Sequence, residues 1–305
     1  MFDSAKLQYN SINFVFQFFS MISDEQFQKE IELIIANAIR EDVGEGDHSA
    51  LACIPEDALG SAVLLVKDDG IIAGVEFAQK VFKYIDSNLE VEILKHDGDV
   101  VSNGDIAFKV SGASQSILKV ERLVLNAMQR MSAIATKTYA FVSIIKDTKT
   151  QILDTRKTTP GIRALEKWAV KIGGGCNHRF GLYDMIMLKD NHIDFAGGIK
   201  EAIKKTHQYL NHQNLDLKIV VEARNIKEVE EILKEKPIYR ILLDNFNVQN
   251  TRKAVKLIGD KCLTESSGGI TLKTAKAYAE CGVDFISSGA LTHSVYNMDM
   301  SLKAV

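Results

Sequence analysis

The chain has 305 residues, of which 46% are apolar and 25% are charged. This length fits one large α/β domain with a smaller companion, and the composition is ordinary for a globular protein. The net charge of -3 at pH 7 excludes a whole-molecule attraction to nucleic acid or to an anionic membrane surface. Any affinity for anions must therefore come from a local cluster of cationic side chains.

The cysteines and the N-terminal segment bear on the compartment. The four cysteines lie far apart in the sequence, at Cys53, Cys176, Cys262 and Cys281. Without a Cys-x-x-Cys pair, they predict reduced thiols in a cytoplasmic protein. The apolar run near the start is interrupted by Gln17 and lacks a signal-peptide cleavage pattern, and no stretch reaches the roughly 18 apolar residues of a membrane-spanning helix. We expect residues 1–20 to be an N-terminal extension.

The part of the chain before Thr150 predicts a small α+β domain. Residues 24–41 have the apolar spacing of an amphipathic helix with Asp24 as its N-cap, and residues 42–60 are loop-like. Further helices are expected at residues 74–86, 118–131 and 132–147. Short strands separated by Asp-Gly and Asn-Gly turn signals are expected at residues 62–67, 71–73, 91–95 and 106–111.

Beyond Thr150, six short apolar runs each end at a polar residue and are followed by a helical pattern. This alternation implies a parallel sheet, and six units in a row favour a closed barrel over an open sheet. The chemistry of such barrels lies at the C-terminal ends of the strands. The residues at these ends are Asp154, Lys189, Glu222, Asp244, Glu265 and Ser287. Taken singly, each is equally well explained as a helix cap or the start of a loop.

Two cationic segments follow the first barrel strand. Thr155, Arg156 and Lys157 come directly after it, and Arg and Lys are the side chains that bind carboxylates and phosphates. Farther on, three consecutive glycines precede His178 and Arg179, and glycine allows the backbone to approach a ligand closely. The alternatives are a solvated loop for the first segment and a flexible linker for the second.

Lys189 and two acidic residues lie at later strand ends. Lys189 is suited either to a Schiff base or to phosphate binding, and the sequence does not choose between them. Glu222 and Asp244 end successive strands, which lie about 5 Å apart in a sheet, so we expect their carboxylates to be neighbours. Such a pair is able to hold Mg²⁺ through water or to stabilise a cationic transition state. Alternatively, each acid pairs with a nearby lysine.

Two Ser-Gly loops follow the last two strands. They contain Ser267, Gly268 and Gly269 in the first loop and Ser288, Gly289 and Ala290 in the second. Backbone N–H groups in such loops bind phosphate, and the last two strand loops are the usual phosphate site of a barrel. His293 lies close behind and either adds a donor or is an ordinary loop histidine. Arg122, on the helix before the barrel, would alone be read as a surface charge.

Together these motifs resemble those of the quinolinate phosphoribosyltransferase family. The match runs in order from about residue 24 to the C-terminus, and its specificity comes from the combination rather than from any single motif. The segments that carry the resemblance are Glu121–Asn126, Asp154–Gly161, Gly173–Leu182, Leu188–His192, Val221–Glu222, Leu243–Phe246, Glu265–Ile270 and Ser287–Ser294.

The resemblance implies a fold and an assembly. The family has an N-terminal α/β sandwich domain, here residues 21–132 with residues 292–305 packing back on it. It also has an incomplete parallel α/β barrel of about six strands, here residues 133–291. In the family's homodimer, the N-terminal domain of one subunit covers the barrel mouth of the other. By that analogy, Arg122 would reach into the partner's active site.

The resemblance also implies roles for the site residues. The residues around the two carboxylates of quinolinate would be Arg156, Lys157, His178 and Arg179. Lys157 and Lys189 would face the phosphoribosyl donor, and the two Ser-Gly loops would hold its 5′-phosphate. Thr155 and His293 belong to the same substrate-binding set. The expected catalytic residues are Lys157, Lys189, Glu222 and Asp244, of which Glu222 and Asp244 would also face the metal ion.

The implied reaction joins quinolinate to phosphoribosyl pyrophosphate in NAD biosynthesis, with Mg²⁺ and without an organic cofactor. Its products are nicotinate mononucleotide, pyrophosphate and CO₂. Three rival interpretations remain. A nicotinate phosphoribosyltransferase would bind one carboxylate and need fewer cations. An aldolase would use Lys189 as a Schiff-base amine. A non-catalytic sensor of a phosphorylated ligand would need the Ser-Gly loops but not the Glu222–Asp244 pair.

Overall fold

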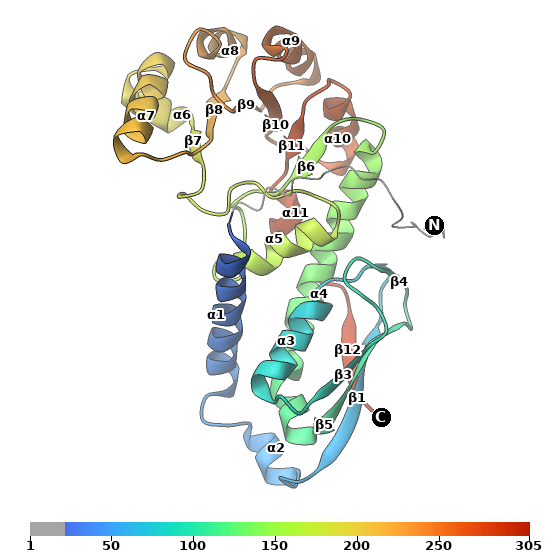
Figure 1. Ribbon diagram of the computed structural model, residues 1–305. Coiled ribbons are helices and arrows are strands. Elements are labelled where there is room, and N and C mark those ends of the chain that lie inside the picture. The colour runs from blue at the N-terminus through green and yellow to red at the C-terminus, as the bar shows by residue number, and fades with distance from the viewer. Residues whose placement is uncertain (1–21) are drawn as a thin grey trace.

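The computed structural model describes residues 22–305, which form two parts joined by one long helix (Figure 1). The extension expected at residues 1–20 lies outside the described residues. Within residues 22–305, no helix is long and apolar enough to cross a membrane.

The first part is built on an antiparallel sheet of four strands in the order β12-β1-β5-β3. These strands are β1 (Leu59–Val66), β3 (Glu90–Ile93), β5 (Ile106–Ala113) and β12 (Met300–Ala304). A second, two-stranded sheet pairs β2 (Gly70–Ile71) with β4 (Val100–Val101). Because β12 pairs with β1, the C-terminal end of the chain returns to this first part after the barrel is complete (Figure 1).

The first part also contains three helices. Two of them, α1 (Asp24–Val43) and α2 (His48–Cys53), come before β1 in the chain, and α3 (Val75–Ile85) comes between β2 and β3. The apolar face of α3 packs on the sheet, and the rings of Phe82 and Phe108 meet edge to face with their centroids 5.8 Å apart. Two details differ from the sequence prediction. The N-cap of α1 is Ser23 and not Asp24, because the Ser23 hydroxyl accepts the N–H of Gln26 at 3.1 Å. The expected loop at residues 42–60 contains α2, capped by the side chain of Asp47.

One continuous helix, α4 (Ser114–Ile145), connects the two parts, where the sequence predicted two helices meeting at residues 131 and 132. It is about 48 Å long. Neither Gly nor Pro occurs within it, so nothing in its sequence ends the backbone hydrogen-bond ladder at the expected boundary. It contacts α3 and β5 in the first part and α5, α10 and β6 in the second (Figure 1). It thereby sets the position of one part relative to the other.

The second part is a parallel sheet of six strands in the order β6-β11-β10-β9-β8-β7, as the sequence predicted. The strands are β6 (Gln151–Leu153), β7 (Ile186–Leu188), β8 (Ile219–Ala223), β9 (Arg240–Asp244), β10 (Leu263–Ser267) and β11 (Phe285–Ser287). Their helices are α5 (Arg163–Ile172), α6 (Asp190–Ala196), α7 (Ile199–Gln213), α8 (Ile226–Ile232), α9 (Val248–Ile258), α10 (Leu272–Ala279) and α11 (Ala290–His293). Since β6 and β7 do not pair, the barrel is incomplete, and the expected fold class is confirmed.

The segment after α5 spans the gap between β6 and β7. The N–H of Cys176 donates to Ile152 O at 2.8 Å, which attaches this segment to the free edge of β6. At the other side, Arg179 Nη1 donates to Met185 O at 3.1 Å, next to β7. A Cβ at Gly175 would lie 2.7 Å from Thr138 Cγ2 of α4, so this glycine allows close passage against a helix and not, as the sequence suggested, against a ligand. We call residues 173–185 the gap segment.

Candidate active site

A cavity of 680 Å³ lies at the C-terminal ends of the barrel strands. It brings together every predicted site residue except Arg122. These residues are Thr155, Arg156, Lys157, His178, Arg179, Lys189, Glu222, Asp244, Ser267, Gly268, Gly269, Ser288, Gly289, Ala290 and His293. They come from the C-terminal ends of the strands, from the loops that follow those ends, and from the segment between α5 and β7, so the cavity exists only in the folded barrel.

The cations of the cavity have few partners. Among residues 22–305, no carboxylate forms an ion pair with Arg156, Lys157 or Arg179. Burial lowers the pKa of Arg179, and the nearby charge of Arg156 lowers it further. The buried guanidinium of Arg179 and the exposed one of Arg156 repel each other, which favours an anion with more than one negative charge.

Hydrogen bonds to other protein groups fix the loop after β6. The Thr292 hydroxyl donates to Lys157 O at 2.8 Å, and the Thr155 hydroxyl accepts the N–H of Lys157 at 3.0 Å. Farther along the loop, the buried carboxylate of Glu166 accepts the N–H of Thr159 at 3.1 Å and forms a 2.9 Å ion pair with Arg130 of α4. The loop that carries Arg156 and Lys157 is therefore fixed by the protein and not only by a ligand. Arg130 and Glu166 could not be predicted from the sequence, because their partners lie in distant segments.

Both ring nitrogens of His178 lie close to protein groups. Its Nδ1 accepts the N–H of Arg179 at 2.7 Å, and its Nε2 lies 3.4 Å from Glu265 Oε2. The imidazole of His178 therefore contacts the backbone of Arg179 on one side and faces Glu265, an acid of the barrel interior, on the other.

Glu265 and Arg240 form a buried ion pair below His178, with 2.8 Å between Arg240 Nη1 and Glu265 Oε2. Burial alone would raise the pKa of Glu265, but His178 and Arg240 outweigh it and bring the pKa to about 2. The guanidinium of Arg240 also lies 4.6 Å from the centre of the Phe285 ring. Arg240 was not predicted from the sequence because it begins β9, whereas the predicted site residues lie at or after the C-terminal ends of the strands.

The acidic side of the cavity consists of Glu222 and Asp244. Burial raises the pKa of Glu222, the negative charge of Asp244 raises it further, and Lys189 opposes both effects. Asp244 accepts a 2.7 Å hydrogen bond from Asn245 Nδ2. The charge of Asp244 therefore acts on the pKa of Glu222, and neither carboxylate forms an ion pair with a lysine within residues 22–305. The site favours a cationic ligand, or a positive charge that develops during a reaction, beside them.

The two Ser-Gly loops meet at the opposite side of the cavity from β7. Gly268 and Gly269 have φ angles of 95° and 62°, a left-handed conformation that glycine adopts without strain. The Ser288 hydroxyl donates to Ile270 O at 3.1 Å, which joins the second loop to the first. A Cβ at Gly289 would lie 2.7 Å from Lys157 Cδ, so the lysine stem crosses directly over this loop. Backbone donors and a lysine together suit a phosphate group.

Asp154 and Arg122 do not line the cavity. Asp154 ends β6 as expected, but it is fully buried and bonded to protein groups, so it does not line the cavity. Arg122 is exposed on α4 and does not line the cavity of its own chain. No group of three or more His, Cys, Asp or Glu residues suited to a metal ion occurs in residues 22–305. Glu222 and Asp244 are a donor set that fits Mg²⁺ sharing its ligands with water and a phosphate-bearing substrate.

An incomplete parallel barrel with unpaired cations, an acidic pair and Ser-Gly loops at its mouth is typical of an enzyme that acts on phosphorylated and carboxylated ligands. Family models agree with this class. The model described as "Quinolinate phosphoribosyl transferase, N-terminal domain" matches residues 47–132, and the model of the C-terminal domain matches residues 134–303.

Curated relatives and solved structures give the same result. The chloroplastic nicotinate-nucleotide pyrophosphorylase (carboxylating) of Arabidopsis thaliana is 45% identical over 289 residues, which cover 90% of this chain and 82% of the relative. A probable nicotinate-nucleotide pyrophosphorylase (carboxylating) of Bacillus subtilis is 40% identical over 277 residues, covering 90% and 93%. The structure of the nicotinate-nucleotide pyrophosphorylase from Francisella tularensis has a TM-score of 0.83 at 35% identity and covers 91% of this chain and 96% of that one. The chain belongs to the quinolinate phosphoribosyltransferase family, as its motifs indicated.

Replacing Glu222 with Gln should stabilise the ligand-free protein at neutral pH. Because the folded-state pKa of Glu222 is raised, the folded protein binds this proton more tightly than the unfolded chain does. The carboxylate therefore costs no stability below the ordinary glutamate pKa, and the full cost is present once the pH has risen through the raised value. Thermal melts should show Glu222→Gln a few degrees more stable than wild type at about pH 8, and equal to it at about pH 4.

The control is Glu230→Gln, on the exposed face of α8, which should melt like wild type at both pH values. A Glu222→Gln protein that is no more stable than wild type at the higher pH would contradict the assigned charge repulsion.

Proposed function

We propose that the protein transfers the phosphoribosyl group of phosphoribosyl pyrophosphate to quinolinate, and that nicotinate mononucleotide, pyrophosphate and CO₂ are the products. The observation that carries the proposal is the coexistence, in one 680 Å³ cavity, of unpaired cations for two carboxylates and Ser-Gly loops for a phosphate. The carboxylating and decarboxylating activities printed in the names of the relatives support the same reaction.

In the first step, the pyridine nitrogen of quinolinate attacks C1 of the ribose, and the C1–O bond to pyrophosphate breaks. Arg156 and Arg179 orient the acid through charge-assisted hydrogen bonds to its carboxylates. Positive charge develops on the sugar ring as pyrophosphate leaves, and the carboxylates of Glu222 and Asp244 stabilise it. Lys157 and Lys189 compensate the negative charge of the phosphate groups.

In the second step, the C–C bond to the 2-carboxylate breaks and CO₂ leaves. The bonding electron pair stays at C2 of the ring, which is stabilised by the positive charge on the alkylated nitrogen, and C2 then takes a proton from solvent. Since the substrate's own ring accepts these electrons, we expect no organic cofactor. Glu222 and Asp244 would hold Mg²⁺ together with the pyrophosphate of the donor, and the ion would supply positive charge that offsets the charge of the leaving group.

We also propose a cytoplasmic location. All four cysteines are free, which is consistent with a reducing compartment. The Arabidopsis thaliana relative is named chloroplastic, so family membership alone does not imply the cytoplasm.

One assay tests the proposed reaction directly. Purified protein is incubated with quinolinate, phosphoribosyl pyrophosphate and Mg²⁺, and the nucleotide is detected by mass and the CO₂ by trapping. The proposal predicts equal amounts of nucleotide and CO₂. Turnover of nicotinate without CO₂ release would instead indicate a nicotinate phosphoribosyltransferase. Borohydride trapping of a carbonyl compound on Lys189 would indicate an aldolase. Tight binding without turnover would indicate a sensor.

Replacing Arg179 with Ala should weaken quinolinate binding far more than binding of the ribose donor. The loss of one charge-assisted contact in a desolvated site should raise the KM for quinolinate by about tenfold to a hundredfold. The KM for phosphoribosyl pyrophosphate should change by less than about threefold, because the Ser-Gly loops are untouched. Steady-state kinetics with each substrate varied in turn measures both.

The matched control is Lys253→Ala, which removes an exposed cation from α9 and should alter neither constant. Equal losses for both substrates in Arg179→Ala would contradict the division of the cavity into an acid-binding half and a phosphate-binding half.

We further propose that the protein forms a homodimer with shared active sites. Arg122 is exposed on α4 and lies outside the cavity of its own chain, and the resemblance assigns this position to the partner's site. A cation supplied in this way would add to those that bind the two carboxylates and would complete the cavity.

Mixed dimers should test this sharing. Arg122→Ala and Lys189→Ala subunits should each be inactive as homodimers. A mixed dimer contains one site with neither change, so it should recover about half of the wild-type activity. If each site were built from a single chain, every site in the mixture would remain defective, and verified mixed dimers would show no recovery.

A further inference from the structure

A buried ion pair lies directly behind the two cationic segments of the cavity. Asp154, at the end of β6, is fully buried, and the side chain of Lys167 on α5 is 3% exposed. Lys167 Nζ lies 2.5 Å from Asp154 Oδ1. Two charges taken out of water are stable only when their remaining hydrogen-bonding capacity is also satisfied.

The Asp154 carboxylate satisfies that condition by binding the gap segment. Its Oδ1 accepts the backbone N–H of His178 at 2.8 Å, and its Oδ2 accepts Asn177 Nδ2 at 2.6 Å. Lys167 contributes in the same way, because its Nζ also donates to His178 O at 2.9 Å. Asn177 in turn donates to Lys167 O at 2.9 Å. Both backbone polar groups of His178 are thus held by one ion pair.

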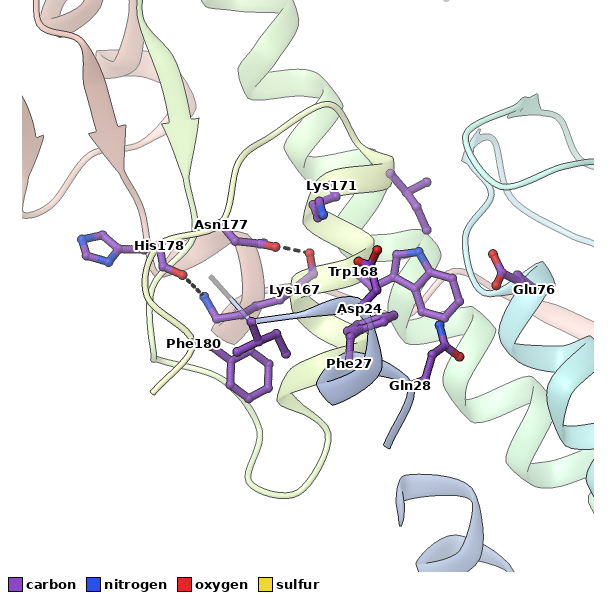
Figure 2. Close-up of a pocket in the computed structure, with 12 residues that line it drawn as sticks. Asp24, Phe27, Gln28, Glu76, Lys167, Trp168, Lys171, Asn177, His178 and Phe180 are labelled. Atoms are coloured by element: carbon purple, nitrogen blue, oxygen red, sulfur yellow. Dashed lines mark hydrogen bonds between the residues drawn. The ribbon is translucent and has the colours of Figure 1, made fainter. Parts of the chain in front are cut away.

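Figure 2 shows the bonds from Lys167 to His178 O and from Asn177 to Lys167 O, beside a second cavity of 410 Å³ that residues of α1 and α5 line. Lys167 reaches from α5 to the backbone of His178, while the imidazole ring of His178 points away, toward the barrel. His178 lines both cavities, Lys167 lines only the second one, and Asp154 lines neither, so the ion pair lies outside the active-site cavity.

The same carboxylate links two loops that are distant in sequence. Asp154 precedes Arg156 by two residues, and its backbone N–H donates to Cys176 O at 3.2 Å. Through His178 it also fixes the position of Arg179. The two guanidinium groups proposed to bind the dicarboxylic acid are therefore both anchored at Asp154, whereas the Ser-Gly loops extend from β10 and β11 and bond to each other.

We propose that the Asp154–Lys167 ion pair is a positioning unit for the acid-binding half of the active site, which sets the spacing of Arg156 and Arg179 without contacting substrate. The inference rests on the proposed function, since quinolinate is the ligand whose two carboxylates these guanidinium groups would bind. A dicarboxylate with fixed geometry is sensitive to that spacing, and displacement by about 1 Å costs on the order of a hundredfold in rate.

The charge of Asp154, and not only its shape, is needed for this role. The two oxygens accept from three different donors. An asparagine has the same shape but one oxygen, so its NH₂ group would face either Asn177 or the Lys167 and His178 donors. The gap segment would then move to relieve the donor–donor contact.

The experiment compares three variants: Asp154→Asn, Lys167→Met, and the two together. The double variant leaves no unpaired buried charge, so it remains informative if Asp154→Asn alone does not fold. For each folded variant, the KM values for quinolinate and for phosphoribosyl pyrophosphate are measured separately, and amide hydrogen exchange is followed by residue. Asp154→Asn and the double variant should lower kcat/KM for quinolinate on the order of a hundredfold and change the KM for the ribose donor by less than about threefold.

Hydrogen exchange gives a readout that does not depend on the reaction. The amide of His178 donates to Asp154, so its exchange should accelerate in these variants, while the amides of residues 266–270 keep their wild-type rates. Lys167→Met leaves both carboxylate bonds to the gap segment in place and should show a smaller effect on both measures.

Asp284→Asn is the matched control. Asp284 is also a carboxylate of the barrel that accepts from a lysine and a backbone amide, at 2.8 Å from both Lys149 Nζ and the N–H of Thr264, but it lies at the opposite end of the strands. This variant should lower Tm without changing the KM for quinolinate.

The outcomes separate this inference from the proposed function. If wild type turns over quinolinate, but folded Asp154→Asn and the double variant keep the wild-type kcat/KM for quinolinate or lose affinity for both substrates equally, the positioning role is overturned and the proposed function stands. If wild type does not turn over quinolinate, the proposed function fails and the assigned role in positioning that acid fails with it. A selective loss for quinolinate, together with faster exchange at His178, supports both.

Discussion

The guanidinium groups of Arg156 and Arg179 lie close together without carboxylate partners, and the rest of this structure depends on that constraint. Burial and the nearby charge of Arg156 lower the pKa of Arg179, and no carboxylate within residues 22–305 forms an ion pair with either side chain. The free protein gains no stability from this arrangement; it is favourable only when an anion binds. Such a site requires a backbone that is fixed by other interactions, and the buried ion pairs of Asp154, Glu166 and Glu265 supply them. The cations without carboxylate partners face the cavity, whereas Asp154, Lys167, Glu166 and Arg130, which form ion pairs, do not line it.

The incomplete barrel explains how these charges reach one place. Since β6 and β7 do not pair, their free edges leave a gap, and the gap segment fills it by bonding to β6 through Cys176 and to Met185 through Arg179. A seventh regular strand would alternate its side chains between the barrel interior and the helices. An irregular segment instead presents the adjacent residues His178 and Arg179 to the same cavity. The departure from a closed barrel thus provides the acid-binding half of the site.

Much of the fold and most of the cavity could be predicted from the sequence, because strand ends of a parallel barrel meet at one face whatever the details of packing. The separation of Glu222 from Asp244 by one βα unit was enough to predict that they are close. The burial of Asp154 could not be predicted in the same way. Its environment depends on Lys167 and Asn177, which approach it only when α5 and the gap segment are folded. For the same reason the unbroken course of α4 was missed: its apolar pattern serves two different parts of the molecule, and only the absence of Gly and Pro indicated continuity.

The cations of the cavity are suited to a ligand with two carboxylates, and isothermal titration calorimetry measures whether both are bound. Quinolinate and nicotinate differ by one carboxylate and share the pyridine ring, so their affinities for the protein isolate the contribution of the second negative charge. We expect quinolinate to bind at least about tenfold more tightly than nicotinate and to lose more affinity as salt is added. Equal affinities with equal salt dependence would contradict it.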